Sequence, residues 1–162
     1  MKDAIIKIFE EGARVKTVFV KENVDRIVEV VHVIAQAFRD GKKVLLFGNG
    51  GSSTDACHIA AEFVNRFLMD RPPLPAIALN TDPAVLTSIS NDFGYDQIFS
   101  KQLAALGHEG DVVIGLSTSG NSPNVIRALE VAKKGGMKTV VLTGGSGGKM
   151  ANMADFTFIV PS

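Results

Sequence analysis

The chain has 162 residues, of which 46% are hydrophobic and 21% charged, so it can form one folded domain with its own core. Its 17 basic and 17 acidic residues cancel and are mixed along the chain, and no basic block favours binding to nucleic acid. We find no signal-peptide pattern and no apolar run long enough to cross a membrane. With a single cysteine, Cys57, these features predict a cytoplasmic protein.

Residues 3–21 and 22–40 are each expected to form a helix. In the second segment apolar residues recur at helical spacing, as in Val24, Ile27, Val28 and Val31, and further valines widen the apolar face. Helices that are apolar on more than one side are usually covered both by their own domain and by a partner. A thicker core within one chain is the alternative to an oligomer, and we favour a homo-oligomer.

The remaining sequence alternates short apolar runs with helical segments. We expect strands at 43–47, 75–79, from 111, at 138–142 and at 156–160. Helices are expected at 53–68, after Asp82-Pro83, at 95–106, at 123–134 and at 149–153. This alternation predicts a single α/β domain over residues 1–162, with a doubly wound, five-stranded parallel sheet that is covered on both faces.

A glycine-rich loop follows the first predicted strand, with the sequence Gly48-Asn49-Gly50-Gly51-Ser52. Ser52 and Asp55 have the spacing of a capping box, which would place the free N–H groups of a helix beside the glycines. The loop lacks the third glycine of the dinucleotide fingerprint and the lysine of a Walker loop. It is either a phosphate-binding loop or only a tight turn between a strand and a helix.

A second loop of this kind follows the strand that begins at Asp111. It offers four hydroxyl groups, from Ser117, Thr118, Ser119 and Ser122, before Pro123 at the expected first helical position. Neither loop contains Lys or Arg, and such a neutral cradle suits one phosphate monoester. Ligands of parallel sheets bind at the carboxyl ends of the strands, where both loops fall. The two loops together favour a sugar phosphate as the ligand.

His58 and Glu62 are four residues apart on the predicted helix after the first loop, so they share one face. A histidine and a carboxylate at this spacing can bind one metal ion or act as an acid and a base. A solvated or purely structural pair is the alternative. The position of the pair after a phosphate loop favours a functional role.

Four motifs in chain order resemble the SIS (sugar isomerase) domain and, within it, the phosphoheptose isomerases. They are Gly48 to Ser52, the His58 and Glu62 pair, Asn91-Asp92-Phe93-Gly94, and Ser117 to Ser122. The resemblance implies a flavodoxin-like SIS fold and a homotetramer. It also implies an isomerase that converts sedoheptulose 7-phosphate to D-glycero-D-manno-heptose 7-phosphate for heptose and lipopolysaccharide precursors.

The same resemblance implies roles for particular residues. It implies Glu62 as the base that moves a proton between C1 and C2, and His58 with Glu62 as ligands of one zinc ion per subunit. The residues that it implies as substrate contacts are Asn49, Gly50, Gly51, Ser52, Glu62, Asn91, Asp92, Ser117, Thr118, Ser119 and Ser122. Among these, the serines and threonine would hold the phosphate, and Asn91 and Asp92 would meet the sugar hydroxyls.

The family pattern includes a further helix, with a Gln and a His that complete the zinc site, and this helix would begin after Ser162. We therefore expect the sequence to be part of a longer protein. The alternative function is a non-catalytic, sugar-phosphate-binding SIS protein similar to the one that associates with the bacterial replication initiator. Asn80-Thr81-Asp82 resembles that subfamily, whereas Glu62 favours the enzyme.

Overall fold

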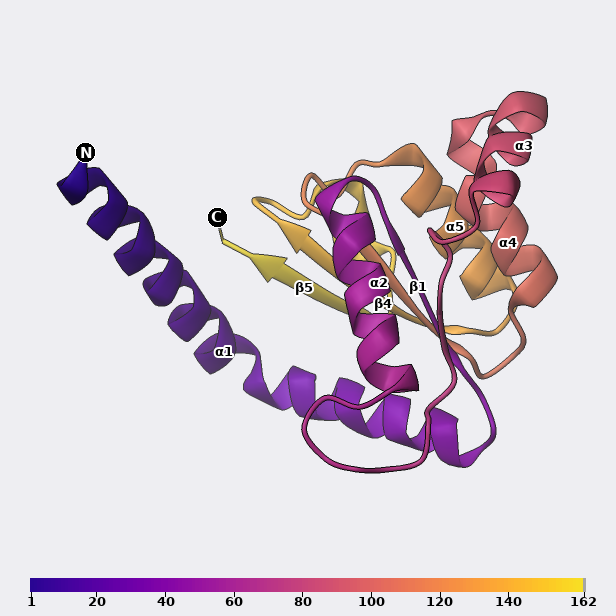
Figure 1. The fold of residues 1–162 in the computed structure, drawn as a ribbon, viewed down its shortest axis with the longest axis horizontal. Coiled ribbons are helices and arrows are strands. Elements are labelled where there is room, and N and C mark those ends of the chain that lie inside the picture. The colour runs from indigo at the N-terminus through magenta and orange to yellow at the C-terminus, as the bar shows by residue number, and fades with distance from the viewer. Residues whose placement is uncertain (162) are drawn as a thin grey trace.

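The computed structural model describes residues 1–161, in which a five-stranded parallel sheet has the strand order β2-β1-β3-β4-β5 (Figure 1). The strands are β1 Val44–Gly48, β2 Ala76–Ala78, β3 Val112–Ser117, β4 Lys138–Gly144 and β5 Phe156–Val160. The helices are α1 Lys2–Arg39, α2 Gly51–Val64, α3 Pro83–Phe93, α4 Ile98–Leu106 and α5 Pro123–Lys134, with short 3₁₀ turns η1 Tyr95–Gln97 and η2 Gly148–Asn152. The predicted doubly wound α/β fold is confirmed.

Side chains of β1 show how the sheet is covered on both faces. Leu45 and Phe47 point into a core shared with α4 and α5, whereas Val44 and Leu46 point into a second core shared with α1 and α2. All five residues of β1 are buried, as expected for a central parallel strand. The strand order reverses between β1 and β3, so the loops after these two strands lie together at the switch point of the sheet.

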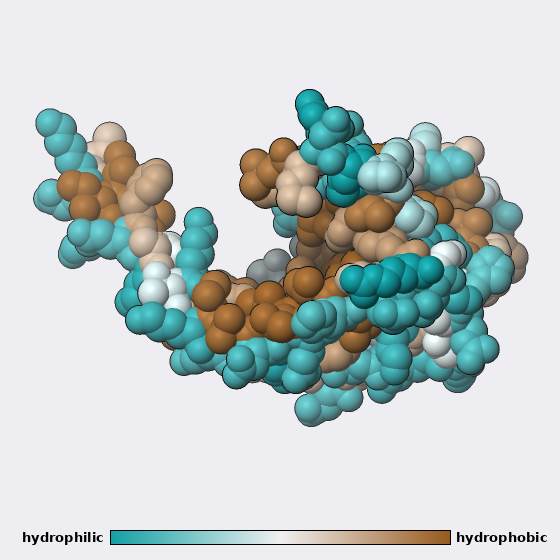
Figure 2. All heavy atoms as spheres, turned by 90° about the horizontal axis from the view of Figure 1, so that it is seen from below, coloured by the Kyte–Doolittle hydropathy of each residue, from teal (hydrophilic) through white to brown (hydrophobic). Residues whose placement is uncertain are grey.

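The N-terminal region is one helix of 38 residues, α1, and not the two helices that we expected. No proline or helix-ending glycine interrupts residues 13–40, so nothing in the sequence stops the helix between the two predicted segments. In Figure 1 the N-terminal half of α1 projects away from the sheet. Its exposed apolar side chains include Ile5, Ile6, Ile8 and Phe9, and Figure 2 shows apolar surface in brown along this arm and in the hollow beside it.

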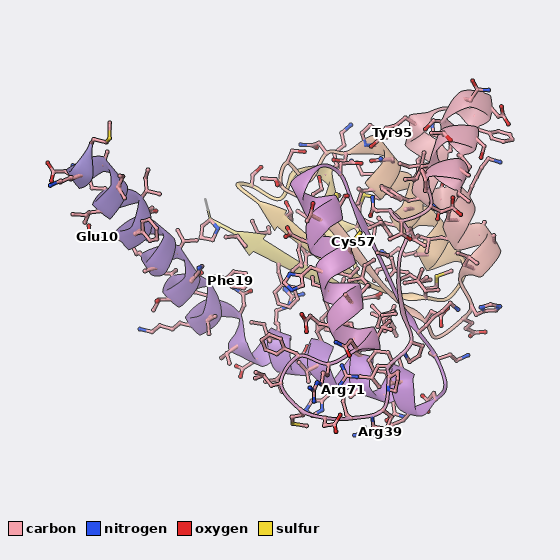
Figure 3. The ribbon with its side chains drawn as sticks, viewed as in Figure 1. Glu10, Phe19, Arg39, Cys57, Arg71 and Tyr95 are labelled. Atoms are coloured by element: carbon pink, nitrogen blue, oxygen red, sulfur yellow. The ribbon has the colours of Figure 1, made fainter. Side chains whose placement is uncertain are left out.

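Helix α2 differs from the prediction at both ends. Gly50, with a φ of 56°, is its N-cap, and no side chain caps the helix, so the predicted capping box of Ser52 and Asp55 is wrong. At the other end α2 stops at Val64, where the predicted helix continued to residue 68. The guanidinium of Arg71 donates to the carbonyl oxygens of Glu62 and Phe63, which satisfies acceptors at this helix end (Figure 3).

Helices α3 and α5 follow their sequence signals. The Asp82 carboxylate accepts from the backbone N–H groups of Ala84 and Val85, as expected of an N-cap before Pro83. α5 spans the predicted residues. Within residues 1–161, no helix has the length and hydropathy that crossing a membrane would require.

Candidate functional site

A cavity of about 230 Å³ lies at the switch point of the sheet, between the loops after β1 and β3. Each loop leads directly into a helix, so the starts of α2 and α5 flank this cavity. The residues that line it are Asn49, Ser52, Leu116, Ser117, Thr118, Ser119 and Ser122. The structure therefore brings together the two predicted phosphate loops.

The cavity is neutral in side-chain charge but polar. None of its lining residues carries a charge, and neither α2 nor α5 has an acidic residue in its first turn. The N-terminus of a helix bears a partial positive charge and free N–H groups, which favour a bound anion. An added Cβ at Gly51 would meet no atom within 4 Å, so a ligand can approach the backbone there. This arrangement suits a small anion that is bound without an ion pair.

The serine hydroxyls of the β3–α5 loop are linked to one another. Ser117 Oγ and Ser122 Oγ lie 2.8 Å apart in a hydrogen bond. Ser122 is the N-cap residue of α5, as predicted, but its side chain makes no capping bond to the helix. Ser119 Oγ accepts the N–H of Asn121 at 3.2 Å, which leaves its own proton available.

A third glycine-rich loop, residues 143–148, packs against the serine loop. Gly144 N donates to Thr118 O at 3.0 Å, and Met150 N donates to Gly120 O at 3.0 Å. Gly120 has a φ of 62°, and a Cβ there would collide with the carbonyl of Gly147. The two loops thus meet backbone to backbone, and this close approach requires glycine.

Asn49 belongs to a side-chain network that the sequence did not indicate. Its amide pairs reciprocally with the amide of Asn124, with both N···O distances at 2.9 Å. Tyr95 Oη donates to Asn49 Oδ1 at 3.0 Å. Asn124 is buried next to Pro123 at the start of α5, and no sequence signal distinguishes it from an ordinary helix residue.

His58 and Glu62 form a pair on α2, with His58 Nε2 3.2 Å from Glu62 Oε1. Neither residue lines the cavity. Ten residues separate Ser52 from Glu62, and the rise of an α-helix puts them about 15 Å apart along its axis. Within one chain the pair thus lies beyond the phosphate loop, further along α2.

A zinc ion in a structural or catalytic site usually has three or four protein ligands. His58 and Glu62 are suitable donors, but residues 1–161 contain no group of three or more His, Cys, Asp or Glu side chains that could hold a metal ion. The described residues alone do not fit a complete zinc site.

Asn91 and Asp92 lie in the last turn of α3, and both are exposed. Asn91 Nδ2 donates to Asp92 Oδ1 at 2.8 Å, and neither side chain lines the cavity. The contact between Tyr95 and Asn49 nevertheless links this segment to the cavity.

The fold and this site define a doubly wound α/β protein with a polar pocket, free of charged side chains, at its switch point. Comparison with known proteins is more specific: the SIS domain model matches residues 8–144, and the chain belongs to the SIS domain family. It is 57% identical to the phosphoheptose isomerase of Thermodesulfovibrio yellowstonii, over all of the chain and 81% of that protein. It is 55% identical to the phosphoheptose isomerase of Aquifex aeolicus, over all of the chain and 85% of that protein.

Solved structures agree with these relatives. The chain is 41% identical to the phosphoheptose isomerase of Neisseria gonorrhoeae, with a TM-score of 0.92 over 99% of the chain and 86% of that structure. The phosphoheptose isomerase of Francisella tularensis has the same identity and a TM-score of 0.94, over 99% of the chain and 85% of that structure.

Proposed function

We propose that this chain is an aldose–ketose isomerase that converts sedoheptulose 7-phosphate to D-glycero-D-manno-heptose 7-phosphate in heptose precursor synthesis. The observation that carries the proposal is the neutral cavity between the starts of α2 and α5, with its hydroxyl groups and without a charged side chain. Relatives more than half identical over the whole chain are phosphoheptose isomerases, which supports the same substrate.

In this proposal the phosphate occupies the cavity beside the four hydroxyl groups of Ser117, Thr118, Ser119 and Ser122 in the β3–α5 loop. Up to three of these hydroxyls can donate to the phosphate oxygens, because one proton is used in the hydrogen bond between Ser117 and Ser122. A sugar phosphate held without Lys or Arg can leave after turnover, because no strong ion pair must be broken.

The chemical step moves a proton between adjacent carbons. A base removes a proton from C1 of the ketose, and the C2 oxygen takes up a proton to give a cis-enediol. A proton is then returned to carbon C2 while the C1 hydroxyl loses its proton and becomes the aldehyde. We propose Glu62 as this base, since a carboxylate within hydrogen-bond reach can carry out both transfers. Because Glu62 lies about 15 Å along α2 from Ser52, the extended sugar or a second copy of the chain must bridge this separation.

Assembly into a homotetramer is part of the proposal. The exposed apolar side chains on the N-terminal half of α1, among them Ile8 and Phe9 at 71% and 76% exposure, are the surface that supports it. Sedimentation at micromolar concentration should give a species of about four chain masses. A single-chain species would contradict the assembly.

We also propose that His58 and Glu62 are two of the ligands of one zinc ion per subunit. Zinc analysis of the purified protein should give about one ion per chain, and His58→Ala should reduce this content. We place the protein in the cytoplasm, where the free thiol of Cys57 would remain reduced.

The experiment that tests the function is an isomerase assay with sedoheptulose 7-phosphate, followed by NMR of the sugar. Sedoheptulose without phosphate is the matched control. Conversion of the phosphorylated sugar alone is expected. Binding of the sugar phosphate without conversion would contradict the enzyme and favour a non-catalytic sugar-phosphate-binding protein.

A further inference from the structure

The amide of Asn49 is held in one orientation by its neighbours. The backbone N–H of Val125 donates to Asn124 Oδ1 at 3.0 Å, and since a backbone N–H can only donate, the Asn124 atom that faces it is the oxygen. This contact therefore distinguishes Oδ1 from Nδ2 in the Asn124 amide. In the reciprocal pair, Asn124 Nδ2 then faces Asn49 Oδ1, and Asn124 Oδ1 faces Asn49 Nδ2.

The Asn49 side chain has one hydrogen-bond donor left for a ligand. Its carbonyl oxygen has two lone pairs, which accept from Asn124 Nδ2 at 2.9 Å and from Tyr95 Oη at 3.0 Å. Its amide nitrogen has two protons, and one of them is donated to Asn124. The second N–H has no partner among residues 1–161, and Asn49 lines the cavity.

The short turn η1 that carries Tyr95 is linked to α5 by an ion pair. Its neighbour Asp96 forms an ion pair with Arg127 at 2.8 Å, which ties η1 to α5 beside the cavity. The Tyr95 side chain is 60% exposed, so it is not held by burial in the core. In Figure 3 Tyr95 lies at the end of the molecule where α2 begins. Its hydroxyl therefore completes the set of donors to Asn49 without being needed for packing.

We infer that Asn124 and Tyr95 are positioning residues that fix Asn49 as a hydrogen-bond donor, so that the cavity selects an acceptor oxygen of the sugar phosphate. This inference rests on the proposed function for the identity of the ligand. Turning the Asn49 amide around would place an N–H against the Asn124 amino group and would lose both bonds to Oδ1. A preorganised donor costs no reorientation when the ligand binds, which is how fixed dipoles stabilise developing negative charge.

The first test uses the ligand-free protein and needs no activity. In ¹⁵N-labelled protein, the two side-chain amide protons of Asn49 should exchange with water at clearly different rates, because only one of them is bonded. Equal exchange of both protons would overturn the inference. Tyr95→Phe should speed the exchange of the protected proton, since it removes one bond that holds the amide.

The second test is a double-mutant cycle on the affinity for sedoheptulose 7-phosphate, measured by calorimetry. We expect about a tenfold loss for Asn49→Ala and about a threefold loss for Tyr95→Phe, in the range of single hydrogen bonds. In the Asn49→Ala background, Tyr95→Phe should have no further effect, because Tyr95 acts only through Asn49. Ser88→Ala, which removes an exposed hydroxyl from α3, is the control and should leave affinity unchanged.

Two results distinguish this inference from the proposed function. If losses for Asn49→Ala and Tyr95→Phe multiply, the positioning role is wrong even if the protein is an isomerase. If the cycle is coupled but no sugar is converted, the positioning role stands and the isomerase assignment fails. Asn124→Ala should be coupled to Asn49→Ala in the same way, and Tyr95→Phe keeps the test valid if loss of the buried Asn124 prevents folding.

Discussion

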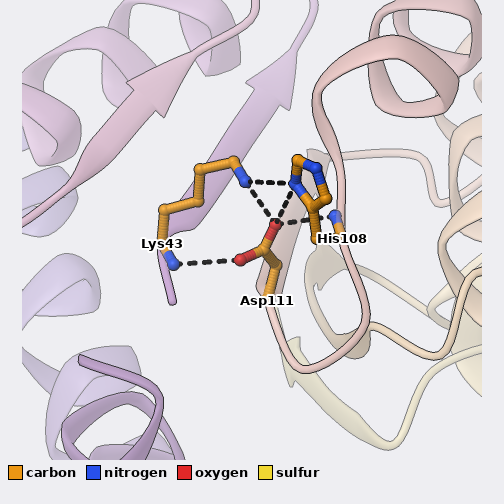
Figure 4. A network of polar contacts seen from close by, with 3 residues as sticks. All are labelled: Lys43, His108 and Asp111. Carbon is orange, nitrogen blue, oxygen red and sulfur yellow. Dashed lines mark hydrogen bonds and ion pairs between the residues drawn. The ribbon is translucent and has the colours of Figure 1, made fainter. Parts of the chain in front are cut away.

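Asp111 and Lys43, the residues directly before β3 and β1, link these two strands at the end of the sheet opposite the cavity. The Asp111 carboxylate accepts from Lys43 N at 3.0 Å and from Lys43 Nζ at 2.6 Å (Figure 4). The backbone N–H of His108 also donates to it, at 2.8 Å. The Asp111 side chain is only 1% exposed, so these three donors replace its water.

Stability should depend on the charge of Asp111. Burial alone would raise the pKa of this carboxyl, but the Lys43 ammonium and the backbone donors of Lys43 and His108 outweigh it and hold the pKa below its ordinary 3.8. A carboxyl with a lowered pKa stabilises the fold above the pKa of the unfolded chain, and this contribution is lost as pH falls below about 3.8.

Asp111→Asn should therefore lower the free energy of unfolding at pH 7 by about 1–3 kcal/mol, since it weakens bonds to a buried group. Urea unfolding at pH 7 and at pH 3 measures this difference. The difference in the free energy of unfolding between wild type and variant should be smaller at pH 3 than at pH 7. An equal difference at the two pH values would show that the charge of Asp111 does not stabilise the strands.

Replacement of Gly120 by Ala should disturb the serine loop more than replacement of Gly145. Both glycines have a positive φ, and an alanine there costs roughly 1–2 kcal/mol. Only at Gly120 would the new Cβ also collide with backbone, namely that of Gly147, whereas at Gly145 it would face open space. Phosphate affinity should fall for Gly120→Ala and persist for Gly145→Ala, as calorimetry can measure. Equal losses would mean that contact between the loops does not shape the cavity.

Ser119→Ala and Ser122→Ala each remove a hydroxyl that lines the cavity. A hydrogen bond to a charged group contributes roughly 1.5–3 kcal/mol, so affinity for sedoheptulose 7-phosphate should fall about tenfold or more. Ser146→Ala, at an exposed position of the third loop, is the matched control. Unchanged affinity for both cavity variants would place the phosphate elsewhere.

Glu62→Gln keeps the size and helix propensity of the side chain but removes its basicity. Turnover should fall at least about a hundredfold, the low end of general-base contributions, while the fold and the affinity for phosphate persist. Steady-state kinetics with Glu130→Gln, an exposed position on α5, provide the control. Undiminished turnover by Glu62→Gln would remove this residue from the mechanism.

The sequence predicted the sheet well because its signals are local. Each strand is a short apolar run, and Pro123 and Asp82 mark the starts of their helices. The predicted boundary between two N-terminal helices, at residues 21 and 22, was wrong. The helical pattern of residues 13–40 contains no residue that would end the first helix there. The capping box at Ser52 was wrong because Gly50 adopts a conformation that begins the helix two residues earlier, at Gly51, without a side-chain cap.

For the candidate site, the sequence indicated the residues of the two loops but not how they are supported. Asn49, Ser52 and the serine loop meet because parallel strands end at the same edge of the sheet. The pairing of Asn49 with Asn124 joins residues 75 positions apart, and a single asparagine at the start of a helix carries no signal for it. The separation of Glu62 from the cavity follows from its position along α2 and the rise of an α-helix.

Isomerisation of sedoheptulose 7-phosphate through an enediol lets the transferred proton exchange with solvent. Incubation in D₂O, followed by proton NMR of the sugar, detects this exchange. We predict that D-glycero-D-manno-heptose 7-phosphate forms and carries deuterium at C2, and that Glu62→Gln abolishes both signals. A folded protein that binds the sugar phosphate but yields no aldose and no deuterium at C1 or C2 would contradict the account.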